Sequence, residues 1–141
     1  MCIRDSSKTQ TEIAIATPNG FEPNPEVVKK ASKSTVVELT TDPKSAIKDA
    51  DIIMTDTFTS IHTSDPKRTE KFLPTFQVND SLMEKAKNDA IFMHCLPAKR
   101  EQEVTSSIID GPQSVVWDEA ENRLHSQKAL LLSLILSLIH I

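Results

Sequence analysis

The chain has 141 residues, of which 38% are hydrophobic and 26% are charged, which is enough for one globular domain with a buried core and too few for two. Its net charge of −4 gives no reason to expect binding to nucleic acid or to an anionic membrane, since both attract basic surfaces. The two cysteines are far apart and lack the spacing of metal ligands, which argues against a disulfide scaffold or a structural zinc site and favours the cytoplasm.

The two ends of the chain differ from the rest. Met1–Ser6 and Leu136–Ile141 can be encoded by inverted copies of one nucleotide string, so we interpret both hexapeptides as derived from linker DNA and exclude them from the fold. This places a domain at residues 7–135, with Cys95 as its one cysteine. The apolar segment 129–139 is shorter than the roughly 20 residues of a membrane-spanning helix, so we expect a docking helix there and no membrane contact.

Taken in order, the pattern predicts alternating strands and helices. Short apolar runs closed by turn residues predict the strands. Asn24 and Asp42 each stand directly before a proline, which is the usual start of a helix because the side chain caps the first turn. The predicted strands are 12–17, 35–40, 51–55, 91–94 and 114–117. The predicted helices are 25–32, 43–50, 66–72, 80–87, 105–109 and 120–134.

This alternation predicts an α/β fold, namely a doubly wound parallel sheet of about five strands with helices on both faces and right-handed crossovers. A dinucleotide fingerprint is absent, since the sequence holds only Gly20 and Gly111. The polar segment 56–66 is longer than the usual connection of about 4–6 residues, and loops of that kind are typically functional or disordered.

Three of the predicted strands are followed by residues with useful chemistry. Asp56 follows the third strand, His94 and Cys95 end the fourth, and Arg123 comes after the fifth. Because ligands bind at the carboxyl edge of open parallel sheets, we expect these groups to converge there. A carboxylate suits an ammonium group, and an arginine suits an oxyanion or a phosphate. A thiol and backbone carbonyls would lie beside a reacting centre.

Each of these residues also has an ordinary structural explanation. Aspartate often caps a turn, as Asp56 would here, and a lone cysteine is more often a small buried hydrophobe than a nucleophile. Arg123 has the spacing to pair with Glu119 on one face of a helix. Since consecutive residues of a strand point to opposite faces, we expect no catalytic dyad of His94 and Cys95.

Two segments carry a family resemblance. HCLPAKR (94–100) and EVTSSIIDGPQSVVWDEAENRLHSQKALL (103–131) resemble the ornithine carbamoyltransferases, which have an HCLP strand end and a DEAENR segment before the last helix. The similarity covers essentially residues 13–132. It implies that the chain is the ornithine-binding domain of such an enzyme, without the domain's first strand and helix and without the amino-terminal carbamoyl-phosphate domain.

The resemblance implies an ornithine site. Asp56 would bind the amino-acid end of ornithine, with Ser60 and Ile61 in the loop that closes over it. The family has Ser-Met-Gly where this chain has Ser60-Ile61-His62. A transcarbamylase with a different amine acceptor, such as a modified ornithine or a diamine, is therefore the nearest alternative.

The resemblance also implies how the reaction proceeds. Cys95, as the catalytic residue, and Leu96 would contact carbamoyl phosphate and the attacking amine, while Arg123 would hold the carbamoyl phosphate. The neutral δ-amine would attack the carbamoyl carbon and phosphate would leave, giving citrulline for arginine biosynthesis, with no metal and no organic cofactor. Members of the family form homotrimers. A noncatalytic α/β module that binds an amino acid, and a cysteine-dependent hydrolase, are the alternatives from other classes.

Overall fold

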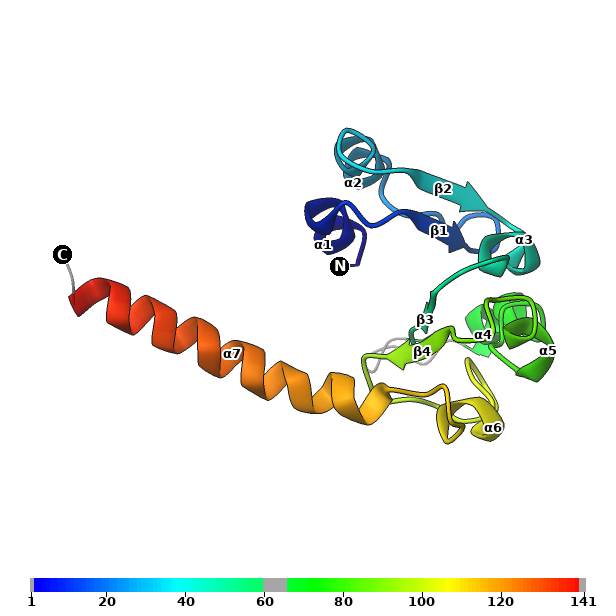
Figure 1. The fold of residues 1–141 in the computed structure, drawn as a ribbon. Helices are drawn as coiled ribbons and strands as arrows, with labels where there is room; N and C mark the ends of the chain where they lie inside the picture. Colours follow the sequence, from blue (N-terminus) through cyan, green and yellow to red (C-terminus); the bar gives the residue numbers. More distant parts are fainter. Residues whose placement is uncertain (1, 60–65, 140–141) are drawn as a thin grey trace.

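The structure is a computed structural model that describes residues 2–59 and 66–139 (Figure 1). Strands and short helices alternate over most of the chain, and a long helix ends it. The strands are β1 (Ile13–Ala16), β2 (Val37–Thr40), β3 (Ile52–Thr55) and β4 (Ile91–His94). The helices are α1 (Cys2–Thr9), α2 (Pro25–Ala31), α3 (Pro43–Ile47), α4 (Pro66–Phe72), α5 (Asp80–Met83), α6 (Ser106–Ile109) and α7 (Val116–Ile139).

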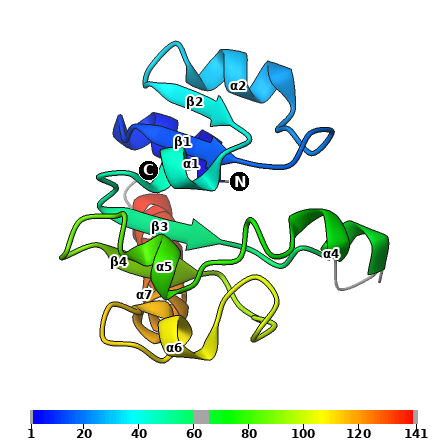
Figure 2. The ribbon, with the colours of Figure 1, turned by 90° about the vertical axis from the view of Figure 1, so that its right-hand side faces the viewer.

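The strands pair in parallel, and they do so in two separate pairs. β1 pairs with β2 and β3 pairs with β4, and Figure 2 shows one pair above the other. Ser114 adds a single parallel bridge to Phe92 on β4. The predicted α/β class with parallel strands is confirmed. The prediction of about five strands in one sheet needs correction, because the described residues form two pairs and a bridge.

The two strand pairs are separated by a cavity between β1 and β3. In a doubly wound sheet the chain steps outward in both directions from a central strand. Here β1 leads outward to β2, while β3 leads outward to β4 and then to Ser114. A cavity of about 460 Å³ lies between the pairs and is lined by Ile15 of β1 and Ile53 of β3.

The predicted starts of α2 and α3 are confirmed in atomic detail. Asn24 Oδ1 accepts a hydrogen bond from the Glu26 N–H at 2.9 Å, and Asp42 Oδ1 accepts one from the Lys44 N–H at 3.0 Å. A proline follows each cap directly, and its fixed φ suits the first helical position. Short polar side chains thus start α2 and α3 where the sequence predicts.

The predicted fifth strand is wrong. Residues 114–117 read as a strand because they are apolar and β-branched, yet the Val115 carbonyl accepts the Glu119 N–H at 2.9 Å, which is a helical hydrogen bond. Helix α7 therefore begins at Val116, four residues before the predicted start. It runs to Ile139, through part of the segment that we interpret as linker-derived; that interpretation stays a prediction.

The hydrophobic core lies around β3 and β4. Phe92 on β4 is fully buried, as are Val104 and Val116 from the segments packed beside it. The core is completed by other buried residues from the segment between 47 and 109: Ile47, Ile53, Val78, Leu82, Met83, Ala90, Ile108 and Ile109. Ile53 of β3 and Phe92 of β4 belong to this cluster. The core therefore fixes the positions of the residues that follow those strands.

Helix α7 extends away from the rest of the molecule (Figure 1). Its leucines are largely exposed, with Leu124 at 65% and Leu130 at 60% of their full accessibility. The expected helix is present and its first residue, Val116, is buried in the core, but its leucines between 124 and 136 are exposed and do not dock on the described part of the chain. None of the described helices is both long enough and apolar enough to cross a membrane.

Candidate functional site

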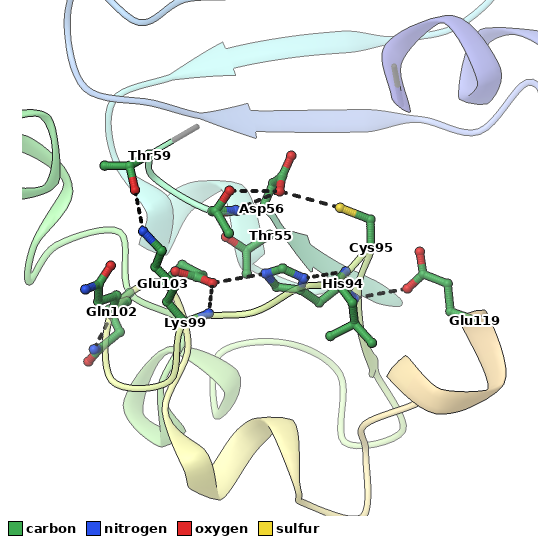
Figure 3. Close-up of polar contacts among 12 residues, drawn as sticks. Thr55, Asp56, Thr59, His94, Cys95, Lys99, Gln102, Glu103 and Glu119 are labelled. Carbon is green, nitrogen blue, oxygen red and sulfur yellow. Dashed lines mark hydrogen bonds and ion pairs between the residues drawn. The ribbon is translucent and has the colours of Figure 1, made fainter. Parts of the chain in front are cut away.

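The candidate site lies where β3 and β4 end side by side (Figure 3). In the parallel register Thr55 stands opposite His94, so the next residues along each strand, Asp56 and Cys95, are also neighbours. The Cys95 thiol donates a hydrogen bond to Asp56 Oδ1 over 3.5 Å. The same oxygen accepts the Thr57 N–H at 2.7 Å, which orients the carboxylate. The structure thus brings together the acid and the thiol that the sequence placed at one edge.

Cys95 is held as a neutral thiol. Burial raises its pKa to about 11, and the negative charge of Asp56, the hydrogen bond to Asp56 and the charge of Glu119 act in the same direction. A thiolate is the reactive form of cysteine, and at neutral pH a group with this pKa is almost entirely protonated. The site therefore gives no support to a hydrolase that uses Cys95 as a nucleophile.

His94 points away from Cys95, as the alternation along a strand predicts. Its side chain is buried, whereas Cys95 is exposed. Its Nε2 lies 3.3 Å from Glu103 Oε1, and its Nδ1 accepts the Leu96 N–H at 2.9 Å. Its main-chain N–H donates to Glu119 Oε2 at 3.0 Å. Both ring nitrogens are engaged on the inner side of the strand, so the two adjacent residues form no dyad.

Arg123 approaches the site from the side of α7. It lines a hollow of about 580 Å³ together with Cys95, Leu96 and Trp117. No ion pair between Arg123 and Glu119 occurs in the described part of the chain, and Glu119 instead accepts the main-chain N–H of His94. Arg123 thus lines the same hollow as Cys95 and Leu96, and its role at the site stays a prediction.

The loop after β3 begins in a fixed position. Phe58 and Thr59 are both buried, and the Phe58 ring stacks on Phe72 with 4.7 Å between centroids. The Arg68 Nε donates to the Phe58 carbonyl at 2.5 Å. Ser60 and Ile61, the predicted loop contacts, lie outside the described residues.

Sequence reasoning missed several residues that shape the site. Glu103 is buried behind His94, and Lys99 joins the two loops because its Nζ donates to Thr59 Oγ1 at 2.8 Å (Figure 3). No signal in the sequence marks these residues, because a glutamate and a lysine in a polar loop are typical of a solvated surface. In the part of the chain that the structure describes, no group of three histidine, cysteine or acidic side chains could hold a metal ion.

Comparison with known proteins points to one family. Residues 2–134 match the family described as aspartate/ornithine carbamoyltransferase, Asp/Orn binding domain. An ornithine carbamoyltransferase of Cenarchaeum symbiosum is 64% identical over 123 residues, which cover 87% of this chain and 41% of that protein. A solved ornithine carbamoyltransferase of Pyrococcus furiosus is 47% identical with a TM-score of 0.85, covering 92% of this chain and 44% of that one.

A third similar protein agrees with these two. The solved anabolic ornithine carbamoyltransferase of Campylobacter jejuni is 34% identical with a TM-score of 0.86, and the match covers 95% of this chain and 47% of that one. The chain thus spans less than half the length of each of these three relatives.

Proposed function

Because the chain belongs to the aspartate/ornithine carbamoyltransferase family, we propose that its residues 7–135 form the ornithine-binding domain of an ornithine carbamoyltransferase. The whole enzyme would transfer the carbamoyl group from carbamoyl phosphate to the δ-amine of ornithine, giving citrulline and phosphate in arginine biosynthesis. The observation that carries the proposal is the contact between Asp56 and Cys95 at the common end of β3 and β4. An acid and a neutral thiol at this place suit the binding of an amine substrate better than they suit a covalent mechanism.

Asp56 would hold the amino-acid end of ornithine. Its carboxylate is exposed at the end of β3, and a charge-assisted hydrogen bond from an ammonium group would add to those that it accepts from Thr57 and Cys95. Ser60 and Ile61 would close over the same end of the substrate. An aspartate at the end of β3 suits this role, whereas a simple cap of the next turn would also accept asparagine or serine.

Cys95, Leu96 and Arg123 would surround the reacting atoms. The Leu96 carbonyl and the Cys95 thiol would orient the neutral δ-amine, and the Arg123 guanidinium would face the carbamoyl phosphate and the oxyanion that forms from it. All three residues line one hollow, which supports a shared role. The step is an acyl transfer: the new bond joins nitrogen to the carbamoyl carbon, and the bond from that carbon to the phosphate oxygen breaks.

The length of the chain, compared with that of its relatives, indicates a further domain in the whole enzyme. The chain spans about two fifths of a curated relative, which leaves room for the carbamoyl-phosphate domain that the resemblance implies. We propose that the whole enzyme is a homotrimer in the cytoplasm and needs no metal or organic cofactor. Its small-molecule partners would be ornithine and carbamoyl phosphate.

The purified 141-residue chain should form no measurable citrulline, because most of the phosphate site lies outside it. Ornithine at millimolar concentration should nevertheless shift the NMR amide signals of Asp56, Thr57 and Cys95, since the groups for the amino-acid end are present. The control is 1,4-diaminobutane, which carries the side-chain amine of ornithine but lacks the amino-acid end. Detectable citrulline formation by the chain alone, or equal shifts with 1,4-diaminobutane, would contradict this expectation.

DNA upstream of the source reading frame provides a second test. The enzyme interpretation requires an amino-terminal domain with a Ser-Thr-Arg-Thr phosphate loop and a His-Pro-x-Gln segment, as the resemblance implies. Extending the genomic sequence should reveal both. An upstream frame without a phosphate loop would favour the noncatalytic amino-acid-binding module instead.

A further inference from the structure

Glu103 is the one carboxylate among the described residues that the structure buries completely. Its Oε1 accepts two hydrogen bonds, from the Lys99 main-chain N–H at 2.5 Å and from His94 Nε2 at 3.3 Å. Its Oε2 has no hydrogen-bond partner in the described part of the chain. Burying a carboxylate is costly even when it is hydrogen-bonded, so a glutamate at this place needs a reason beyond packing.

The contact with His94 fixes the conformation of the HCLP segment. Because His94 Nδ1 accepts the Leu96 N–H, the ring proton is on Nε2, where it points at Glu103. Glu103 thereby selects the tautomer that leaves Nδ1 free to accept. Leu96 has a φ of +50°, which is unfavourable for a residue with a Cβ, so its main chain depends on this hydrogen bond.

The contact with Lys99 fixes the loop after β3. Glu103 holds the Lys99 main chain, and the Lys99 side chain then reaches Thr59 Oγ1 at 2.8 Å. Thr59 is buried and immediately precedes Ser60. One carboxylate oxygen therefore connects both of the loops that would hold ornithine (Figure 3).

We propose that Glu103 is a positioning residue, which sets Cys95 and Leu96 through His94 and sets Thr59 through Lys99. The proposal rests on the proposed function, since it names what orders that site. Glu103 is not part of a proton relay to the thiol. Both nitrogens of His94 are engaged with other groups, and the Cys95 thiol donates to Asp56 on the other side of the strand.

The test compares Glu103→Gln and Glu103→Leu in the 141-residue chain carrying Cys2→Ser, so that Cys95 is its only thiol. Both donors converge on Oε1, so a glutamine keeps its carbonyl oxygen there and should preserve the network. A leucine of similar size removes the acceptor. Glu101→Gln is the matched control, because Glu101 is an exposed acid of the same loop whose side chain accepts the Ser106 N–H at 2.8 Å.

The first measurement is the tautomer of His94 at pH 8, from the nitrogen chemical shifts of the imidazole. The starting chain, Glu103→Gln and Glu101→Gln should all carry the proton on Nε2. Glu103→Leu should give a mixture of tautomers and at least tenfold faster hydrogen exchange of the Leu96 amide. A proton on Nδ1 in the starting chain would overturn the proposal, as would an unchanged tautomer and unchanged exchange in Glu103→Leu.

The second measurement is the rate at which iodoacetamide alkylates Cys95 at pH 8. We expect at least a fivefold increase in Glu103→Leu, because a loosened loop no longer holds the thiol against Asp56, and a change of less than twofold in Glu103→Gln and Glu101→Gln. Equal rates in Glu103→Leu and Glu103→Gln would overturn the proposal.

Lys99→Met supplies a variant that is expected to fold, because the Lys99 residue is exposed and its main-chain bond to Glu103 is kept. It should shift the Thr59 amide signal and leave the His94 tautomer unchanged. An unshifted Thr59 signal would contradict the proposed link from Glu103 through Lys99 to Thr59. This result does not depend on whether Glu103→Leu folds. None of these measurements uses ornithine. If all of them give the expected results and the chain does not bind ornithine, only the proposed function is contradicted.

Discussion

Replacing Asp56 with asparagine is expected to raise the alkylation rate of Cys95 about tenfold at pH 8. Burial raises the pKa of Cys95 to about 11, and the charge of Asp56 and its hydrogen bond to the thiol are the next two causes. The substitution removes the negative charge, keeps an amide oxygen that can still accept from the thiol, and leaves the burial. A fall of about one pKa unit would give about ten times more thiolate, which is the species that iodoacetamide alkylates.

The pH profile gives the direction of this effect. Thiolate forms as pH rises, so the rate in the starting chain should climb up to about pH 11, and the profile of Asp56→Asn should lie at lower pH. Asp51→Asn is the matched control, because Asp51 lies just before the start of β3, is exposed, and pairs with Lys87 at 2.6 Å. Coincident profiles for Asp56→Asn and the control would show that Asp56 does not act on the thiol.

Phe92→Ala should destabilise the chain by about 3–5 kcal/mol, since it removes a fully buried aromatic side chain and leaves a cavity. Phe92 lies at the centre of the core, with Ile53 opposite it on β3 and Ser114 bridged to its other side. Domains are stable by only about 5–15 kcal/mol, so this one change could remove most of the stability.

Urea unfolding followed by circular dichroism measures that loss. Leu124→Ala on α7 serves as the control, because the Leu124 side chain is 65% exposed and its truncation should change the free energy of unfolding by less than about 0.5 kcal/mol. Similar losses in the two variants would mean that β4 is not at the centre of the core.

The sequence predicts the site best where the reasoning is local. The end of β3 is followed by Asp56 and the end of β4 by Cys95, and parallel pairing alone brings them together. The caps at Asn24 and Asp42 are equally local, because each side chain bonds an amide two residues later. In these places the spacing along the chain sets the geometry.

Prediction fails where tertiary contacts decide. The run at 114–117 has strand-forming residues, yet only Ser114 bridges to β4 before the helix begins at Val116. Glu103 and Lys99 belong to the site through contacts with His94 and Thr59 that the spacing along the chain does not indicate. Polar residues in a loop give no sign of whether they face water or a neighbouring loop.

The cavity between the two strand pairs has a practical consequence for the isolated polypeptide. Among the described residues β1 and β3 each pair with one strand only, so the other edge of each strand faces the cavity. Such edges pair with extended segments, and a second molecule can supply one. We therefore expect the isolated polypeptide to aggregate as its concentration rises. Working at low concentration, or adding an apolar peptide of strand length, should reduce the aggregation.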